Sequence, residues 1–117
     1  GGLAAMEKLL AGLAPGEYPT AVVAASDMMA IGCMDAIKRR GLGVPQDISV
    51  IGFDDIDMSR FCTPQLTTIR ADSINMARVA YAHLSRAIRE RAGETDRYTV
   101  RLPVTMIERQ SVGAPSV

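Results

Sequence analysis

The sequence predicts an α/β fold in which helices cover a parallel β-sheet. Segments with helical periodicity alternate with short extended segments along most of the chain, and this alternation is typical of parallel α/β sheets. The extended segment ISVIGF, residues 48–53, is a short apolar run bounded by turn residues, as in strands that are covered on both faces. At 117 residues and 48% hydrophobic content, the chain is long enough for one small core and no more than one domain.

The first element is a helix over residues 2–13, where leucine and methionine recur at helical spacing. Two prolines and a glycine in the following segment APGEYPT end this helix. A short apolar strand is predicted at 21–25. Ser26 and Asp27 then offer the N-cap of a second helix.

The second helix carries an apolar stripe and ends in three cations, which suit a helix C-terminus. Gly41 closes it, because the order Lys-Arg-Arg-Gly-Leu predicts a left-handed glycine cap followed by a hydrophobic contact. Gly32, inside the helix, is interpreted as a packing residue. The stripe consists of Met29, Ala30, Cys33, Met34 and Ile37.

Two more strands and a long helix complete the pattern. The strand ISVIGF covers 48–53, an irregular loop runs through Pro64, and β-branched residues favour a strand at 66–70. A helix is predicted at 73–92, and the segment 98–111 returns to extended character. One face of this long helix carries Ile74, Ala77, Tyr81, Leu84 and Ile88.

Charge and hydropathy exclude several classes of partner. The 13 basic residues balance the 13 acidic ones, so the chain is not expected to bind DNA or an anionic membrane by itself. No apolar run approaches the roughly 18 residues of a membrane span, and the N-terminus lacks the pattern of a signal peptide. Because the chain has no initiator Met and enters directly into a helical pattern, we expect it to begin in the middle of a larger protein.

Motifs for metals, cofactors and catalysis are missing from the sequence. Cys33 and Cys62 are too few and too far apart for a zinc site or a redox pair, so both are predicted to be reduced, structural thiols. His83 lies in the long helix without a second His or Cys at ligand spacing, which indicates an ordinary surface residue. No phosphate-binding glycine loop and no nucleophile elbow occurs. We therefore predict no cofactor, no metal ligand and no catalytic residue.

Polar residues meet at one edge of the predicted sheet. Asp54 follows the strand 48–53, and Ser26 and Asp27 follow the strand 21–25. If these parallel strands are adjacent, their carboxyl ends lie roughly 5 Å apart, at the edge where open α/β sheets bind ligands. A hydroxyl, helix N–H groups and carboxylates without nearby Arg or Lys suit a neutral ligand rich in donors, such as a sugar or nucleoside. The alternative is that Ser26 or Asp27 only caps the helix.

The acids Asp54, Asp55 and Asp57 also allow two catalytic interpretations. A phospho-acceptor pocket requires a lysine after a later strand, whereas Lys8 and Lys38 both lie on predicted helices. A hydrolase with paired carboxylates requires a substrate cleft that one small lobe does not provide. Binding is therefore favoured over catalysis.

The segments VPQDISVIGFDD, PQLTTIR and LPVTMIERQS follow one another along the chain. In this order and spacing they resemble the C-terminal part of the lactose-repressor (LacI) family of bacterial transcription regulators. The resemblance runs from about Gly2 to Gly113. It implies the parallel-sheet C-terminal lobe of a two-lobed effector-binding domain of the periplasmic-binding-protein type. A helix-turn-helix head, which this chain does not contain, precedes that domain in the family.

The resemblance also implies which residues contact the effector. The family's contact positions fall on Ser26, Asp54, Asp72 and Ser73. Ser26 stands where the family more commonly has Asn, and Ser73 where some members have an aromatic residue. Ala71 replaces the frequent Gln or His, so the sugar specificity of known members does not transfer to this chain.

Lobe boundaries and a dimer interface follow from the same resemblance. Residues 1–70 and 100–117 are assigned to the C-terminal lobe, and 71–99 to the crossover and a helix of the N-terminal lobe. Asp27 is more often a helix-start residue than a contact in this family, which favours a cap. The family dimerises through the helix after the first strand and the loop after GFDD. The interface candidates of that loop are Met58, Phe61 and Cys62.

The predicted function is effector sensing and dimerisation in a LacI-type regulator of the bacterial cytoplasm. A small polar ligand, sugar-like or nucleoside-like, closes the two lobes and alters the spacing of paired DNA-binding heads. Operator DNA is contacted only through those heads, and no membrane is involved. Two alternatives remain: a periplasmic sugar-binding protein of a transporter, and an α/β enzyme that uses the Asp54 region as acid or base.

Overall fold

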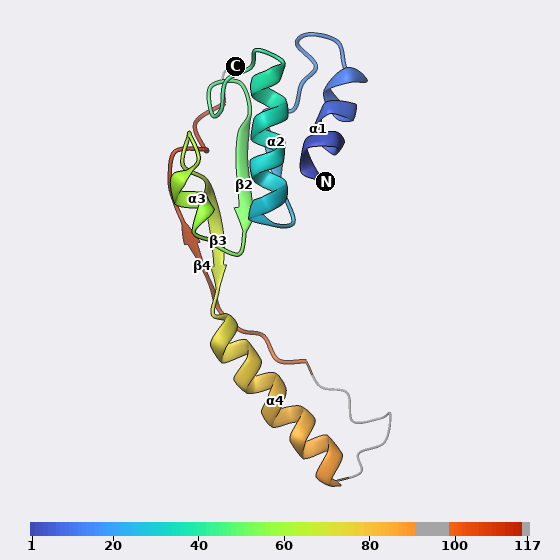
Figure 1. The fold of residues 1–117 in the computed structure, drawn as a ribbon, viewed down its shortest axis with the longest axis vertical. Coiled ribbons are helices and arrows are strands. Elements are labelled where there is room, and N and C mark those ends of the chain that lie inside the picture. The colour runs from blue at the N-terminus through green and yellow to red at the C-terminus, as the bar shows by residue number, and fades with distance from the viewer. Residues whose placement is uncertain (91–98, 116–117) are drawn as a thin grey trace. The chain divides into compact units, whose positions relative to one another are not determined.

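The computed structural model describes residues 1–90 and 99–115, which form two compact units (Figure 1). Unit 1 contains residues 1–70 and the described residues from 105 onward, and unit 2 the described residues between 71 and 104. The elements in chain order are α1 (Gly2–Ala11), β1 (Ala21–Val23), α2 (Asp27–Arg39), β2 (Ser49–Phe53), α3 (Met58–Phe61), β3 (Thr67–Ala71), α4 (Ser73–Glu90) and β4 (Val104–Ile107).

The strands form one sheet in the order β1-β2-β3-β4. Strands β1 and β2 pair in parallel with Val22 opposite Val50, and β2 and β3 pair in parallel with Gly52 opposite Thr68. The predicted parallel α/β sheet is therefore confirmed, with β4 added beside β3 and running in the opposite direction in Figure 1. The carboxyl ends of β1 and β2 consequently lie side by side.

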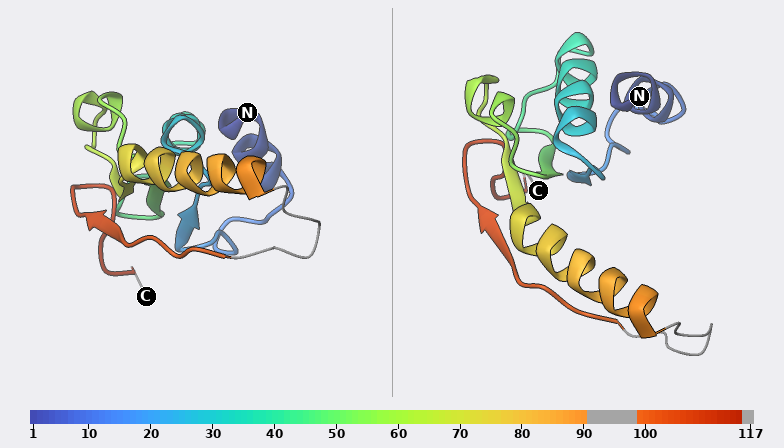
Figure 2. Two further views of the ribbon diagram at one scale, coloured as in Figure 1. Left: turned by 90° about the horizontal axis from the view of Figure 1, so that it is seen from below. Right: turned by 60° about the horizontal axis from the view of Figure 1, so that its bottom comes forward.

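Helices α1 and α2 lie on the same face of the sheet (Figure 2). The core forms between α2, the first residues of β2 and the inner side of α1, and its fully buried members include Leu10, Ile37, Ile48, Val50 and Leu66. Strand β1 is not covered on both faces, because Val23 is 82% exposed. This strand is the edge of the sheet.

Helix α2 begins and ends as the sequence predicts. The Ser26 hydroxyl accepts a hydrogen bond from the backbone N of Met29 at 3.3 Å, which satisfies one of the free N–H groups of the first turn. Gly41 has φ +76°, and its N–H donates to the carbonyl of Lys38 at 2.9 Å. Leu42 N donates to Ile37 O at 3.2 Å, which completes a glycine-based C-cap.

Close approach between α1 and α2 explains the glycine inside α2. A Cβ on Gly32 would lie 2.7 Å from the backbone N of Leu3, so only glycine fits at this crossing. The interpretation of Gly32 as a packing residue is thus confirmed. Cys33 is buried beside it, and both it and Cys62 are free thiols, as predicted.

The loop predicted to be irregular contains a short helix, α3. Four residues are too few for helical periodicity to be visible in a sequence, and so short a helix forms only with tertiary support. Buried Ser59 supplies that support, because its hydroxyl bonds to Asp27 and its carbonyl accepts from Leu66 N at 2.9 Å.

Unit 2 consists mainly of α4, which matches the helix predicted at 73–92 as far as residue 90. The end of that prediction and the start of the extended segment 98–111 lie outside the described residues, and within 99–111 only Val104–Ile107 forms a strand. None of the residues of α4 is buried, and its apolar stripe, including Ile74 and Tyr81, is exposed. Among the described helices, none is both long and apolar enough to cross a membrane.

Candidate functional site

The chain makes an unusual turn at the carboxyl end of β2. Asp54 has φ 113° and Asp55 has φ 53°, although neither is glycine. Positive φ is uncommon for such residues and costs about 1 to 3 kcal/mol each, so surrounding contacts must hold the turn. One of them is the hydrogen bond from Asp54 N to the carbonyl of Ile69 in β3, at 2.9 Å. Strained backbone of this kind concentrates at functional sites, which marks this turn as a candidate.

The two acids of this turn face opposite environments. The Asp54 side chain is exposed and has no hydrogen bond or ion pair with any described residue. The side chain of Asp55 is only 2% exposed and is surrounded by arginines. Asp54 is thus the acid that a ligand can reach, and Asp55 belongs to the protein's own structure.

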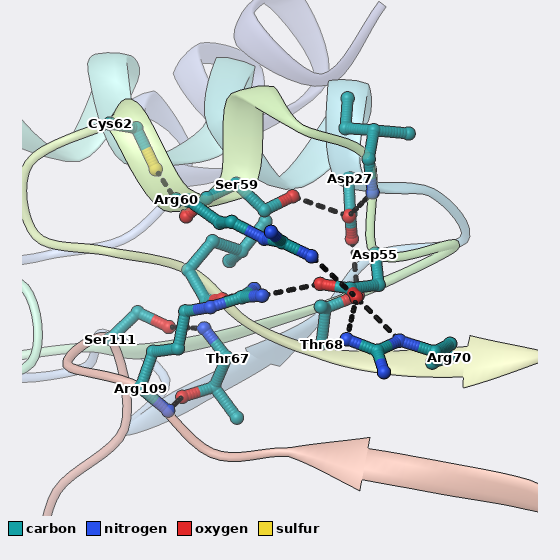
Figure 3. A network of polar contacts seen from close by, with 12 residues as sticks. Asp27, Asp55, Ser59, Arg60, Cys62, Thr67, Thr68, Arg70, Arg109 and Ser111 are labelled. Carbon is teal, nitrogen blue, oxygen red and sulfur yellow. Dashed lines mark hydrogen bonds and ion pairs between the residues drawn. The ribbon is translucent and has the colours of Figure 1, made fainter.

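Asp55 binds arginines from α3, from β3 and from the segment after β4 (Figure 3). Arg70 donates from Nε to one carboxylate oxygen at 2.6 Å, and Arg109 donates from Nη2 to the other. Arg60 contributes a longer ion pair, at 3.9 Å. The expectation of carboxylates without nearby Arg or Lys is therefore wrong for Asp55. Arg70 and Arg109 lie 15 and 54 residues from Asp55, so only the fold brings them to this acid.

Hydrogen bonds from the two closest arginines set the protonation state of Asp55. Burial raises the pKa of this carboxyl group, but the hydrogen bonds and positive charges of Arg109 and Arg70 outweigh burial. The pKa of Asp55 therefore lies below its ordinary value, and the group is ionised at neutral pH.

We predict that the stabilising effect of Asp55 is lost in acid. Because its pKa is lowered in the folded state, the contribution is complete above the unfolded-state pKa of about 3.9 and disappears as the pH falls through the folded-state pKa. Denaturant unfolding of the wild type and Asp55→Asn should therefore give a constant difference in unfolding free energy from about pH 6 to pH 8, and a shrinking difference below about pH 4. A difference that does not change with pH would contradict this account, and Asp57→Asn serves as the control.

A second buried acid, Asp27, joins α2 to the neighbouring elements. It is fully buried, and it accepts hydrogen bonds from the backbone N of Ile56 at 2.9 Å and from the hydroxyls of Ser59 and Thr68 (Figure 3). The interpretation of Asp27 as a cap is wrong, because Ser26 caps α2 and the Asp27 carboxylate bonds to residues outside this helix. Asp27 fixes the loop after Asp54 and α3 against β3.

The C-terminal segment closes the network on its other side. Thr67 N donates to Ser111 Oγ at 2.8 Å, and Ser111 Oγ donates to the carbonyl of Val50 at 2.6 Å. Arg109 N donates to Thr67 Oγ1 at 2.9 Å. The PQLTT and ERQS segments are therefore adjacent in space. Apart from the order of these two segments along the chain, nothing in the sequence indicated this contact.

The four predicted effector contacts fall in two places. Ser26 and Asp54 lie at the carboxyl ends of adjacent strands β1 and β2, at one edge of the sheet. Asp72 and Ser73 lie at the start of α4 in unit 2, where Asp72 Oδ1 accepts a hydrogen bond from Asn75 N at 2.9 Å. The structure brings the first pair together, and the approach of the second pair stays a prediction.

The predicted interface residues lie on and just after α3. Phe61 is 77% exposed, Met58 is exposed, and Cys62 is partly buried with its thiol near the carbonyls of Ser59 and Pro64. Next to them is a hollow of about 430 Å³ with apolar side chains from α1 and α2, including Leu3, Met28, Ile31 and Met34. Within residues 1–90 and 99–115, no group of three or more His, Cys, Asp or Glu side chains could hold a metal ion.

Known proteins match this chain in both sequence and fold. Residues 1–112 match the family described as periplasmic binding protein-like domain. The HTH-type transcriptional repressor PurR of Pectobacterium carotovorum subsp. carotovorum (strain PC1) is 42% identical over 100 residues, which cover 86% of this chain. This chain spans only 29% of the length of that repressor.

Two solved structures are similar to this chain in fold as well as in sequence. The lac repressor dimer bound to operator and the anti-inducer ONPF is 34% identical with a TM-score of 0.73, and the match covers 97% of this chain and 37% of the repressor chain. A LacI family transcriptional regulator from Lactobacillus casei with bound sucrose is 32% identical with a TM-score of 0.71, covering 95% of this chain and 39% of the regulator.

Proposed function

Because the chain belongs to the family of periplasmic binding protein-like domains, of the type found in LacI-family regulators, we propose that it senses a small polar effector within a bacterial transcription regulator. The observation that carries this proposal is Asp54, an exposed carboxylate without a partner among the described residues, held by a strained turn at the carboxyl end of β2. This is the edge at which open α/β sheets bind ligands.

The effector binds between two lobes in this proposal. Residues 1–70 and 100–117 form the C-terminal lobe, and 71–99 belong to the N-terminal lobe. Support comes from the two compact units, which divide the described chain at residues 71 and 104. Further support comes from the exposed apolar stripe of α4, which requires a partner that no described residue supplies.

Four side chains contact the effector, Ser26 and Asp54 from one lobe and Asp72 and Ser73 from the other. The Ser26 hydroxyl accepts the capping bond from Met29 and can still donate to a ligand. Asp54 accepts hydrogen bonds from hydroxyl or amino groups. An effector with several such donors, a sugar or a nucleoside, matches this set, and the relative from Lactobacillus casei was solved with bound sucrose.

The effector acts by shifting a population between open and closed lobe arrangements. A ligand that contacts both lobes binds the closed arrangement more tightly, and only this difference in affinity can move the equilibrium. The closed lobes set the spacing of paired DNA-binding heads, which lie outside this chain. No bond is made or broken, in keeping with relatives that are named transcriptional repressors.

Replacing Asp54 with Ala is predicted to weaken effector binding by about 1.5 to 3 kcal/mol, because one charge-assisted hydrogen bond is lost. The fold should persist, since this side chain is exposed and contacts no described polar group. A thermal-shift screen of the complete protein against sugars, polyols and nucleosides first identifies a ligand, and calorimetry then compares the variant with Asp57→Ala. Unchanged affinity in Asp54→Ala would rule out the assigned contact.

We also propose that the regulator dimerises through α2 and α3, with Met58, Phe61 and Cys62 in the interface. Phe61 is the best-placed residue, because its large aromatic side chain is 77% exposed and offers apolar area that a partner can bury. The adjoining hollow between α1, α2 and the residues after α3 offers apolar surface for a second copy.

Phe61→Asp is therefore expected to weaken dimerisation of the complete protein by roughly a hundredfold or more, since both copies lose a buried aromatic and gain a buried charge. Analytical ultracentrifugation over a range of concentrations measures the dissociation constant. Leu9→Asp, at an exposed apolar position on α1, is the control and should leave the constant unchanged. An equally strong dimer in Phe61→Asp would place the interface elsewhere.

A periplasmic sugar-binding protein of a transporter would share this fold. The relatives in sequence are transcriptional repressors, including PurR and CytR, and these favour the regulator. We therefore also propose that the protein is located in the cytoplasm, as a transcription regulator requires.

A further inference from the structure

The Asp55 carboxylate accepts hydrogen bonds from both segments through which the chain passes between unit 1 and unit 2. Arg70 lies in β3, directly before the chain enters unit 2, and donates to Asp55 Oδ2. Arg109 follows β4, just after the chain has returned to unit 1, and donates to Asp55 Oδ1. Strand β3 and the segment that follows β4 are thus held by the same carboxylate, which we call the anchor.

The bonds of this anchor have directional geometry. Arg70 donates a hydrogen bond from Nε to Asp55 Oδ2 at 2.6 Å, and its Nη2 forms an ion pair with the same oxygen. Arg109 uses its second terminal nitrogen, Nη1, to donate to the carbonyl of Leu66 at 2.7 Å. Arg109 therefore links the returning segment both to Asp55 and to the residue before β3.

Because Asp55 and Arg109 are buried, their ion pair differs from an independent pair on the surface. The side chains of Asp55 and Arg109 are 2% and 9% exposed, so removing one leaves the charge of the other with little solvent to compensate it. Arg70 is half exposed, and its contact is correspondingly easier to lose.

Asp55 also directly follows Asp54, the exposed acid of the candidate site. Both have positive φ, and Asp54 N is bonded to Ile69 in β3. The backbone of Asp54 is therefore tied directly to β3 and, through the next residue, to the arginines of Asp55.

We propose that Asp55 is a positioning residue that couples Asp54 to the two strands crossing between the units. Its carboxylate fixes the positions of β3 and of the segment after β4 relative to the turn at Asp54 and Asp55. A contact made at Asp54 is therefore transmitted to both of them together. The role of Asp54 as the contact rests on the proposed function, whereas the anchoring of the two strands stands on the geometry of unit 1.

Hydrogen exchange of backbone amides in the complete, ligand-free protein tests the anchoring. In Asp55→Asn, amides of 67–71 and of 104–110 should exchange about tenfold faster or more, because Arg70 and Arg109 both lose their charged acceptor, while amides of α1 and α2 keep their wild-type rates. Arg70→Gln should accelerate exchange in 67–71 only. The control Asp57→Asn should change neither segment.

Unchanged exchange in both strands, a change in only one of them, or a uniform increase across unit 1 in Asp55→Asn would overturn the proposal. If Asp55→Asn does not fold, Arg70→Gln decides: selective loosening of 67–71 supports the anchor, and no loosening there overturns it. The ligand screen is a separate measurement, so the outcomes can be told apart. If exchange in Asp55→Asn accelerates only in 67–71 and 104–110 but no sugar, polyol or nucleoside binds, the proposed function is rejected and the role of Asp55 stands. If a ligand binds but exchange does not accelerate selectively, the role of Asp55 is rejected and the proposed function stands.

Discussion

Replacing Asp27 with Ala is expected to lower the free energy of unfolding by about 4 kcal/mol. The carboxylate is fully buried and accepts hydrogen bonds from Ile56 N, Ser59 Oγ and Thr68 Oγ1. Each buried donor left without a partner costs about 1 to 3 kcal/mol, and the deleted atoms leave a small cavity. Denaturant unfolding of the wild type and the variant measures the difference.

Two further variants make this test specific. Asp35→Ala removes an exposed carboxylate from the same helix, where it pairs with Arg39 at 2.8 Å, and should cost less than about 0.5 kcal/mol. Asp27→Asn keeps the shape of the side chain but replaces one acceptor oxygen by an NH₂ group, so an intermediate loss is expected. A loss in Asp27→Ala no larger than that in Asp35→Ala would show that the buried network contributes little.

Gly52→Ala is expected to cost about 3 kcal/mol, for a reason that involves the same acid. A Cβ on Gly52 would lie 2.2 Å from Asp27 Oδ1 and 3.0 Å from a methyl carbon of Leu66, both of which are fully buried. The Asp27 side chain cannot retreat without breaking its bond to Thr68. Glycine in the GFDD segment is therefore required because β2 passes directly over the Asp27 carboxylate.

A double-mutant cycle separates this clash from general strain. Gly52→Ala should cost less in the Asp27→Ala background, since the nearest contact has been removed. Gly12→Ala is the control, because its φ of −86° suits alanine and the nearest atom would be 3.6 Å from the new Cβ. Equal costs of Gly52→Ala in the two backgrounds would contradict the explanation.

The fold was predictable from the sequence where local signals and burial agree. Helix α2 has a serine N-cap, an apolar stripe and a glycine C-cap, and all three occur as expected. Strands β2 and β3 were found from their β-branched residues to within a residue or two. Helix α3 was missed because four residues carry no periodic signal, and its support comes from Asp27, far away in the sequence.

The site was predictable only in outline. Strand order places Ser26 and Asp54 at one edge, as the alternation of helices and strands suggested. Nothing local distinguishes exposed Asp54 from buried Asp55, because the difference arises from Arg109, which lies 54 residues away from Asp55. Asp27 resembled a helix cap for the same reason, since its partners follow in the sequence by 29 to 41 residues. Long-range polar networks of this kind leave no periodic trace in a sequence.

The most direct test of effector binding is a crystal structure of the complete protein with the ligand that stabilises it most in the thermal-shift screen. We expect a hydroxyl or amino group of the ligand within hydrogen-bond distance, about 2.5 to 3.2 Å, of the Asp54 carboxylate, and further ligand contacts to Ser26, Asp72 and Ser73. Asp55 should remain bonded to Arg70 and Arg109 and should not touch the ligand. A ligand bound away from the carboxyl ends of β1 and β2, or one that contacts Asp55 in place of Asp54, would contradict the account.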